Sequence, residues 1–296
     1  MCLECGCSET EGVTIDGEPI GKHTHGHSHS HDHHSHDHSH SHEHSHDHDH
    51  AHDHSHHSHD HDHHSHDHEH SHDHHADGNS GREISIKQEI LHKNNHIAQH
   101  NREYLQSLGV FSMNWISAPG SGKTALLERL IGDFGSELPI FVIEGDQQTD
   151  NDSQRINQAG ARALQINTGA ACHLDADMVH RALHKANLEG CRMLVIENVG
   201  NMVCPTAYDL GENLKVAIIS SPEGEDKPVK YPDLVLAADV LLINKIDLMP
   251  YLDFNLNRCI ELSRQVNPKI TIFPVSAKTG EGLRDFYDWF CAKAGF

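Results

Sequence analysis

One segment of the sequence has the residues of a phosphate-binding loop. Residues 117–124 read Ser-Ala-Pro-Gly-Ser-Gly-Lys-Thr and fit the pattern G-x-x-x-x-G-K-[ST], with Ser117 in place of the first glycine. Backbone N–H groups in such a loop surround phosphates, while Lys123 would reach the β- and γ-phosphates and Thr124 would hold Mg²⁺. We expect nucleotide phosphates at Pro119, Gly120, Ser121, Gly122, Lys123 and Thr124.

Two carboxylates follow predicted strands downstream of this loop. The strand predicted over residues 139–143 runs into an acidic loop, where Asp146 could hold Mg²⁺ or orient the attacking water. Glu197, three residues before Gly200, has the form of a D-x-x-G switch with glutamate for aspartate. Its carboxylate would meet the Mg²⁺ shell, and the Gly200 N–H would sense the γ-phosphate. Asp152 is expected to cap the next helix. The catalytic candidates are Lys123, Asp146 and Glu197.

A third group of residues is suited to reading the base. The run Asn-Lys-Ile-Asp at residues 244–247 follows a buried apolar segment, and its Asp247 can accept hydrogen bonds from the ring N–H and the amine of guanine. Adenine has no such donor pair. Backbone N–H groups after a later strand could meet the guanine oxygen. The predicted guanine contacts are Asn244, Lys245, Asp247, Ser276, Ala277 and Lys278. The four motifs in this order predict GTP and GDP as ligands.

The first residues contain a cysteine cluster. Cys2, Cys5 and Cys7 offer three thiolates within six residues. Such a set suits Zn²⁺, Cu⁺ or Ni²⁺, and a redox dithiol is the alternative. The tract from His23 to His75 has a histidine at about every second position, and imidazole suits the same borderline metals. Its length and mixed composition distinguish it from a purification tag and indicate a metal buffer.

A second set of thiols lies further along the chain. Cys172-His173 and the distant Cys204 each follow a predicted core strand by a few residues, so they could supply two sulfurs and one nitrogen to a metal. Unrelated semi-buried thiols are an equally good interpretation of these residues. Three other cysteines sit at element edges and are expected to be structural: Cys191, Cys259 and Cys291.

Composition divides the chain into three regions. Residues 1–22 hold the cysteine motif and a polar linker, and residues 23–79 cannot build a core and are expected to be disordered. Residues 80–296 suffice for one GTPase domain. Strands and helices alternate there, which predicts an α/β P-loop NTPase with a mostly parallel sheet flanked by helices.

Charge and hydropathy limit the partners. The formal net charge of −22 argues against nucleic acid. The apolar runs are strand-length, and the start lacks a signal-peptide pattern, so we expect a cytoplasmic protein without membrane contact.

Apolar residues over 84–108 recur at helical spacing, and Gly109 could end this helical region of one or two helices. His92, His96 and His100 fall four residues apart on one face. They could bind metal, and solvated surface histidines are an equal interpretation.

In combination these motifs resemble the HypB family of hydrogenase nickel-incorporation GTPases, of the SIMIBI class of P-loop proteins. The resemblance spans nearly the whole chain. It rests on the cysteine cluster, the histidine tract and residues 119–124, 144–149, 172–175, 197–201, 244–247 and 276–278. It implies a Mg²⁺-dependent GTPase that forms a homodimer in its GTP state.

The resemblance also implies metal sites and partners. Nickel would bind the N-terminal cysteines, and nickel or zinc would bind Cys172, His173 and Cys204 near the dimer interface. Nickel would be delivered to the large-subunit precursor of a [NiFe]-hydrogenase, with a HypA metallochaperone as partner. A urease-type nickel GTPase and a metal-storage protein are the alternatives. Because Asn201 rather than glutamine follows the switch glycine, we expect slow intrinsic hydrolysis.

Overall fold

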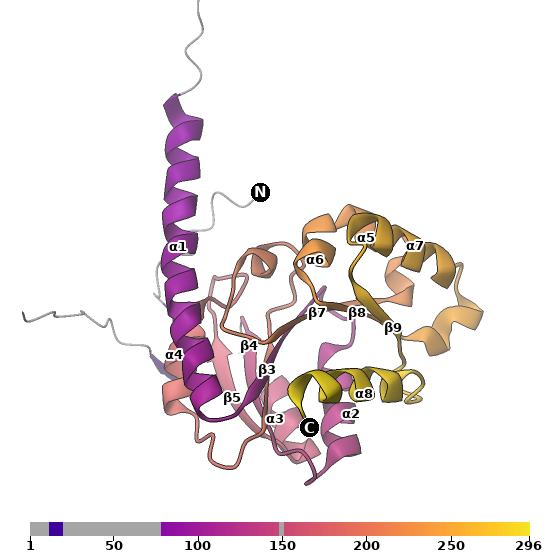
Figure 1. Cartoon of the computed structure of the whole chain (residues 1–296), viewed down its shortest axis with the longest axis horizontal. Coiled ribbons are helices and arrows are strands. Elements are labelled where there is room, and N and C mark those ends of the chain that lie inside the picture. The colour runs from indigo at the N-terminus through magenta and orange to yellow at the C-terminus, as the bar shows by residue number, and fades with distance from the viewer. Residues whose placement is uncertain (1–11, 20–77, 148–150) are drawn as a thin grey trace, which may run out of the picture. The chain divides into compact units, whose positions relative to one another are not determined.

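The computed structural model describes residues 12–19, 78–147 and 151–296 (Figure 1). The cysteines at positions 2, 5 and 7, the histidine tract and its predicted disorder lie outside the described residues. The described strands form one sheet in the order β2-β1-β5-β4-β6-β3-β7-β8-β9. These strands are β1 (Thr14–Ile15), β2 (Glu18–Pro19), β3 (Phe111–Ser117), β4 (Ile140–Asp146), β5 (Arg162–Asn167), β6 (Met193–Glu197), β7 (Leu214–Ser220), β8 (Val240–Asn244) and β9 (Thr271–Pro274).

The sheet is mostly parallel, as predicted. Strands β3 to β9 pair in parallel, whereas β1 pairs antiparallel with both β2 and β5. Parallel strands bring their carboxyl ends to one edge, so the residues that end β3, β4, β6 and β8 lie along the same side of the sheet. Register adds detail to this arrangement, because Glu197 lies opposite Trp115 on one neighbouring strand and opposite Glu144 on the other.

Helices cover both faces of the sheet, which confirms the predicted architecture (Figure 1). They are α1 (Gly78–Ser107), α2 (Lys123–Phe134), α3 (Asn151–Ala159), α4 (Ala176–Lys185), α5 (Lys227–Lys230), α6 (Pro232–Ala237), α7 (Leu256–Val266) and α8 (Leu283–Ala294), with 3₁₀ turns η1 (Cys204–Ala207), η2 (Ser221–Glu223) and η3 (Ile246–Tyr251). One face packs on α2, α3 and α8 through residues such as Leu127 and Phe286. The other face packs on α1 and α4 through Leu105 and Val179, and on α6 and α7 through Val235. Strands buried on both faces explain the continuous apolar runs in the sequence.

A short hairpin, β1–β2, lies within the segment predicted to be a polar linker. Its turn residues Asp16 and Gly17 have φ of 49° and 78°, and two successive positive φ values match the right-handed twist of a tight hairpin. The Asp16 N–H donates to the Gln165 carbonyl at 2.9 Å, and the Gln165 N–H donates to the Asp16 carboxylate at 2.9 Å. These bonds hold the hairpin on the edge strand β5, so residues 14–19 belong to the sheet.

A single helix, α1, forms the helical region before the core, in agreement with the prediction of one or two helices. It ends where expected, since Gly109 has a φ of 67° and donates its N–H to the Gln106 carbonyl. Of the described helices, none has the length and apolar character required to cross a bilayer.

Candidate functional site

The phosphate loop lies between β3 and α2, in the predicted strand–loop–helix context. Gly120 and Gly122 have φ of 75° and 97°, in the left-handed region that favours glycine. A Cβ at Gly122 would also lie 2.6 Å from Asn244 Nδ2. The loop backbone therefore approaches the Asn244 side chain as closely as glycine allows. Asn244 fixes this approach by donating Nδ2–H to the Ser121 carbonyl at 2.9 Å.

Ser117 has a specific role at the first position of the loop pattern. Apart from glycine, positive φ occurs among the described residues only at Asp16 and Lys245, so the backbone at Ser117 does not require glycine. The buried Ser117 hydroxyl donates to the Ala118 carbonyl at 2.7 Å and accepts a hydrogen bond from Lys123 Nζ at 3.1 Å. This serine therefore holds the phosphate-binding lysine at the start of the loop.

A group of acids faces this lysine. Burial lowers the pKa of Lys123, although the neighbouring Glu197 carboxylate opposes the shift. Burial also raises the pKa of Glu197 to about 7, against the opposing effects of Lys123 and of Thr124, which donates its hydroxyl to Glu197 Oε1 at 2.8 Å. Glu144 is 2% exposed, and burial together with the Glu197 charge raises its pKa to about 9. Crowded buried acids of this kind are typical of functional sites.

These residues fit a Mg²⁺ ion. Among the described residues, Glu144 Oε2 and Glu197 Oε2 are buried oxygens without a hydrogen-bond partner. They line one cavity together with Thr124 and Asp146. A hydroxyl and several carboxylates form the oxygen-only donor set that Mg²⁺ prefers, and a cation would relieve their mutual repulsion. Glu144 was not among the predicted site residues. Its only signal in the sequence is an acid at the end of an apolar run, because its register with Glu197 is set by the fold.

Two acidic positions differ from expectation. Asp146 is the last residue of β4 and not part of a loop, because parallel pairing with β5 continues through Asn167. Its carboxylate accepts the Gln147 N–H at 2.7 Å. Asp152 lies inside the first turn of α3, which begins one residue earlier, so the prediction that it caps the helix is wrong. Its carboxylate instead accepts a hydrogen bond from Arg155 Nη1 at 3.0 Å.

The switch glycine contacts the phosphate loop directly. A Cβ at Gly200 would lie 3.0 Å from the Pro119 ring and 3.2 Å from the Pro119 Cα. Gly200 also lines the same cavity as Lys123 and Glu197. The segment after β6 therefore lies where a γ-phosphate on the loop would meet it.

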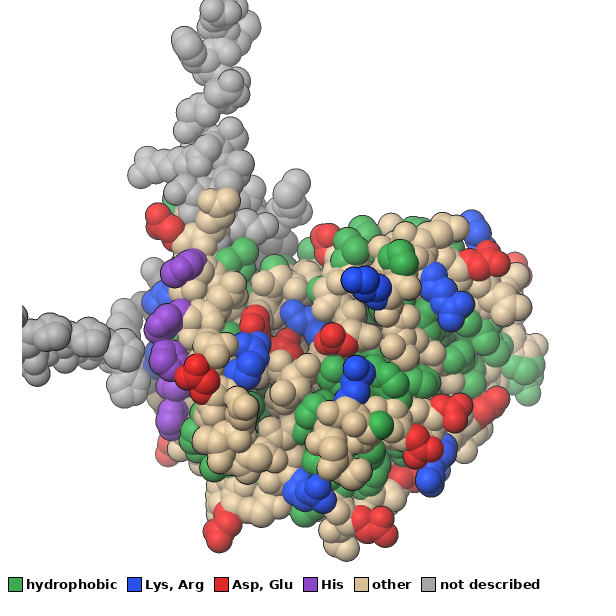
Figure 2. All heavy atoms as spheres, viewed as in Figure 1, with side chains coloured by type: hydrophobic (Ala, Val, Ile, Leu, Met, Phe, Trp, Pro, Cys, Tyr) green, Lys and Arg blue, Asp and Glu red, His purple; other side chains and the backbone are tan. Residues whose placement is uncertain are grey.

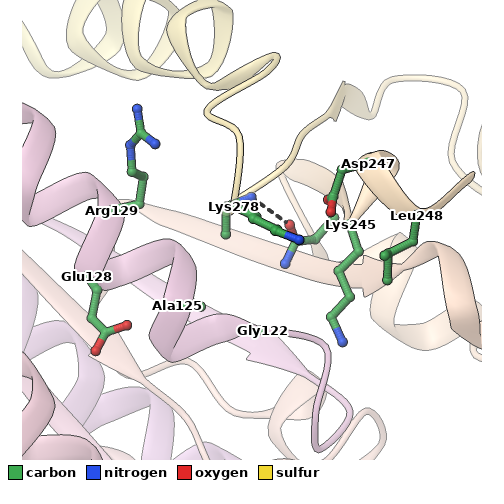
Figure 3. Close-up of a pocket in the computed structure, with 10 residues that line it drawn as sticks. Gly122, Ala125, Glu128, Arg129, Lys245, Asp247, Leu248 and Lys278 are labelled. Carbon is green, nitrogen blue, oxygen red and sulfur yellow. Dashed lines mark hydrogen bonds between the residues drawn. The ribbon is translucent and has the colours of Figure 1, made fainter.

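Five of the six predicted guanine residues line a second cavity (Figure 3), whereas Ser276 is buried and does not line it. Figure 3 shows Lys245, Asp247 and Lys278 on one side of this pocket and Ala125 and Arg129 of α2 on the other. The two cavities share Gly122, Ala125 and Lys245 in their linings, so the base pocket continues into the phosphate site.

Hydrogen bonds fix the guanine-reading side chains. Ser276 donates its hydroxyl to Asp247 Oδ1 at 2.6 Å, and the Ala277 N–H donates to Asn244 Oδ1 at 3.2 Å. Lys245 has a φ of 62° and donates Nζ–H to the Gly120 carbonyl at 2.6 Å. The loops after β8 and β9 are thereby tied to each other and to the phosphate loop. Preorganised acceptors of this kind discriminate between bases because an unmatched base leaves them unpaired.

The second set of thiols forms one cluster. The ligand atoms of Cys172, His173 and Cys204 all lie within 4.8 Å of one another. Burial lowers the pKa of His173 to about 4, so the imidazole is neutral and can act as a metal ligand. Its ring packs on Tyr208 with centroids 4.0 Å apart. Of the two interpretations of the sequence, the geometry favours a metal site over unrelated thiols.

The remaining described cysteines lie elsewhere. Cys191 and Cys259 are buried in the apolar cores, and Cys291 is half-buried in α8. The Cys191 thiol donates to the Met193 carbonyl at 3.1 Å, and burial raises the pKa of the Cys259 thiol to about 12. These features agree with the structural role expected for them.

Two asparagines connect the cysteine cluster to the switch segment. Asn198 Oδ1 accepts the Leu174 N–H at 3.1 Å, and Asn201 donates Nδ2–H to the Cys172 carbonyl at 3.3 Å. Both asparagines flank Gly200, and Cys204 follows three residues after Asn201. Sequence reasoning did not assign this role, since nothing local marks an asparagine as a bridge.

Comparisons with known proteins agree on one family. The model for the CobW/HypB/UreG nucleotide-binding domain matches residues 114–274. A hydrogenase maturation factor HypB of Rhizobium leguminosarum bv. viciae is 53% identical over 216 residues, 73% of this chain and 72% of that protein. A hydrogenase/urease maturation factor HypB of Helicobacter hepaticus is 41% identical over 214 residues, 70% of this chain and 88% of that protein.

A solved structure gives the same result. The crystal structure of HypB from Helicobacter pylori in complex with nickel matches with a TM-score of 0.65 and 38% identity, and the match covers 68% of this chain and 95% of that one. The phosphate loop, the switch and the guanine pocket occur here in the order and geometry of a GTPase. The chain therefore belongs to the HypB family of P-loop GTPases.

Proposed function

We propose that this GTPase binds nickel and inserts it into the large-subunit precursor of a [NiFe]-hydrogenase during maturation. The relatives named as hydrogenase maturation factors and the nickel complex of a HypB protein support this function. The observation that carries it is the proximity of the Cys172, His173 and Cys204 ligand atoms. Backbone hydrogen bonds of Cys172 and Leu174 join the same loop to the switch segment. Two thiols and a neutral imidazole suit Ni²⁺ and Zn²⁺.

GTP binding uses residues that are already arranged. Asp247 accepts the two guanine donors, and the glycines of the phosphate loop leave their N–H groups to the phosphates. Lys123 leaves the Ser117 hydroxyl for the β- and γ-phosphates. Thr124, Asp146 and Glu197, with Glu144 beside them, would hold Mg²⁺, and the ion would supply positive charge beside those phosphates.

Hydrolysis by the isolated protein is slow in this proposal. Asn201 stands where a water-orienting glutamine could follow the switch glycine. Its amide donates to the Cys172 carbonyl, and its Oδ1 accepts the Val203 N–H at 2.8 Å. The Asn201 side chain is thus engaged in holding the loop that leads to Cys204. Slow hydrolysis suits a protein whose metal binding depends on which nucleotide is bound and not on the rate of GTP hydrolysis.

Nucleotide state and metal affinity are coupled through residues 197–204. A γ-phosphate that draws Gly200 toward the loop also displaces Asn201, and with it the position of Cys204 relative to Cys172 and His173. Metal bound by Cys204 must then change GTP affinity by the same factor, because coupling between two binding sites is reciprocal.

The remaining partners belong to this proposal. The GTP-bound protein forms a homodimer near the cysteine cluster, and a HypA-type metallochaperone exchanges nickel with it in the cytoplasm. Nickel also binds Cys2, Cys5 and Cys7, while the histidine tract at residues 23–75 stores it. Neither nucleic acid nor a membrane takes part.

A nickel titration tests the proposal. Wild type is compared with Cys204→Ala and with a Cys2→Ala/Cys5→Ala double variant, each with GDP and with a non-hydrolysable GTP analogue. We expect the nucleotide to change nickel affinity in wild type and in the double variant, and this dependence to disappear in Cys204→Ala. Cys291→Ala is the matched control, because its thiol is half-buried and lies outside the cluster. Equal nickel affinities of the Cys204 site with GDP and with the GTP analogue would refute the coupling.

Urease maturation is a second candidate, since the Helicobacter hepaticus relative is named for both enzymes. We expect a strain that lacks this protein to lose hydrogenase activity and to keep urease activity. The reverse outcome would reassign the target enzyme.

A metal-storage protein with an accessory GTPase domain would respond differently to two changes in the chain. If storage dominated, deletion of residues 23–75 would abolish maturation and Lys123→Ala would be tolerated. We expect Lys123→Ala to stop hydrogenase maturation and the deletion to matter mainly when nickel is scarce. Lys269→Ala is the control, because this exposed lysine lines neither nucleotide cavity.

A further inference from the structure

A group of histidines lies on the surface of α1 and α4. We define the histidine patch as His96 and His100 on α1 with His180 and His184 on α4. Their rings meet in pairs, with centroids 4.7 Å apart for His96 and His100, and 4.5 Å apart for His180 and His184. Figure 2 shows histidine side chains in a row on the side where Figure 1 draws α1. The patch shares no residue with the Cys172, His173 and Cys204 cluster or with the linings of the two nucleotide cavities.

The tautomer of His180 is set by a buried asparagine. Asn101 is fully buried and donates Nδ2–H to the carbonyls of Ala176 at 2.9 Å and Leu210 at 3.1 Å. This orientation turns Asn101 Oδ1, an acceptor, toward His180 Nδ1 at 2.9 Å. His180 must therefore carry its proton on Nδ1, and the lone pair is on Nε2. A metal-binding histidine is usually oriented in this way, with its other nitrogen donating to a fixed acceptor.

The position of His184 relative to His180 also suits metal binding. His184 follows His180 by one helical turn, so both rings project from one face of α4. Two histidines at this spacing are the pair that helical zinc motifs use. Burial and then His184 lower the pKa of His180, Asp177 opposes the shift, and His100 adds a smaller lowering effect from across the α1–α4 contact. Neutral imidazoles at neutral pH are the form that binds metal.

We propose that His180 and His184 chelate a divalent transition metal such as Ni²⁺ or Zn²⁺, with His180 Nε2 as one ligand atom. On α1, His100 lies close enough to act on His180, and the His96 ring contacts that of His100. Asp175, which caps α4, follows His173 by two residues, so the helix that carries the pair begins beside the cysteine cluster. The proposed site therefore adds a metal position on the GTPase domain that needs neither the cysteines nor the nucleotide.

Residue-resolved carbethoxylation of the full-length protein tests this site. Diethyl pyrocarbonate modifies free imidazoles, and peptide mass spectrometry separates His180 and His184 from the histidine tract. NiCl₂ is added until protection of the tract is complete and is then raised further. At about ten times the dissociation constant about one tenth of the site is free, so modification of both residues slows about tenfold.

Single variants distinguish chelation from simple shielding. In His184→Ala, nickel should slow modification of His180 by about twofold or less, because the chelating partner is lost. Lys185→Ala removes the exposed neighbour, keeps both imidazoles and should retain the tenfold effect. GDP binding, which uses none of these histidines, verifies the fold of each variant. Equal modification rates of His180 with and without nickel in wild type, or full protection in His184→Ala, would overturn the proposal.

Discussion

Replacing Ser117 with alanine removes the hydroxyl that accepts a hydrogen bond from the Lys123 ammonium at 3.1 Å. Lys123 is 9% exposed and lines the phosphate cavity, so water in that cavity replaces the lost partner only in part. A hydrogen bond to a charged group contributes about 1.5–3 kcal/mol to stability. In the nucleotide complex the phosphates become hydrogen-bond partners of the lysine. The lost hydrogen bond therefore destabilises mainly the protein without nucleotide. We expect GDP binding to tighten by about tenfold at the lower end of that range and about 100-fold at the upper end.

Two measurements must agree for this reasoning to hold. Isothermal titration gives the GDP affinity of wild type and Ser117→Ala. Denaturant unfolding gives the stability of each protein without nucleotide and with saturating GDP. The free energy of unfolding should fall by about 1.5–3 kcal/mol in the nucleotide-free variant and change little in the complex. Because binding and unfolding form one thermodynamic cycle, the loss of stability equals the gain in affinity.

Ser117→Gly provides an independent check, because it restores the general loop pattern and also lacks the hydroxyl. Glycine in a strand costs about 0.5–1 kcal/mol of stability with and without nucleotide, so it should tighten GDP binding as alanine does. GDP affinity that is unchanged or weaker in both variants would refute the role assigned to Ser117.

Three further predictions concern other parts of the molecule. Gly122→Ala should weaken GDP binding by at least about tenfold in isothermal titration, because a Cβ at a φ of 97° is strained and meets the side chain of the asparagine that ends β8. Gly132→Ala, where the added Cβ has open space, should leave affinity unchanged. Asn201→Ala removes a bond to the Cys172 carbonyl contributing about 1 kcal/mol, so the ratio of nickel affinities with GDP and a GTP analogue should shrink about fivefold. An unaltered ratio would contradict the bridge. The Cys259 thiol, with its pKa raised to about 12 by burial, should resist iodoacetamide at about pH 8 until the protein unfolds; rapid labelling of the native protein would count against this.

The sequence by itself determined the features that depend on neighbouring residues. The phosphate loop needs consecutive residues between a strand and a helix, and residues 117–124 have that form. Asp247 could be assigned to guanine because the chemistry of one carboxylate suffices to exclude adenine. Parallel strands followed from continuous apolar runs, since both faces of such strands are buried. The hairpin at Asp16-Gly17 was not predicted, although Asp-Gly is a hairpin signal, because residues 8–22 were interpreted as a polar linker.

Only the tertiary structure decided which distant residues meet. The order of strands in the sheet places Glu144 beside Glu197, and the connections after β5 and β6 bring Cys172 and His173 to Cys204. In the same way the packing of α1 on α4 turns Asn101 toward His180. Side-chain contacts across the sheet and between helices depend on the path of the whole chain. Spacing in the sequence therefore identified the candidate ligands, and folding determined which of them can act on the same ion.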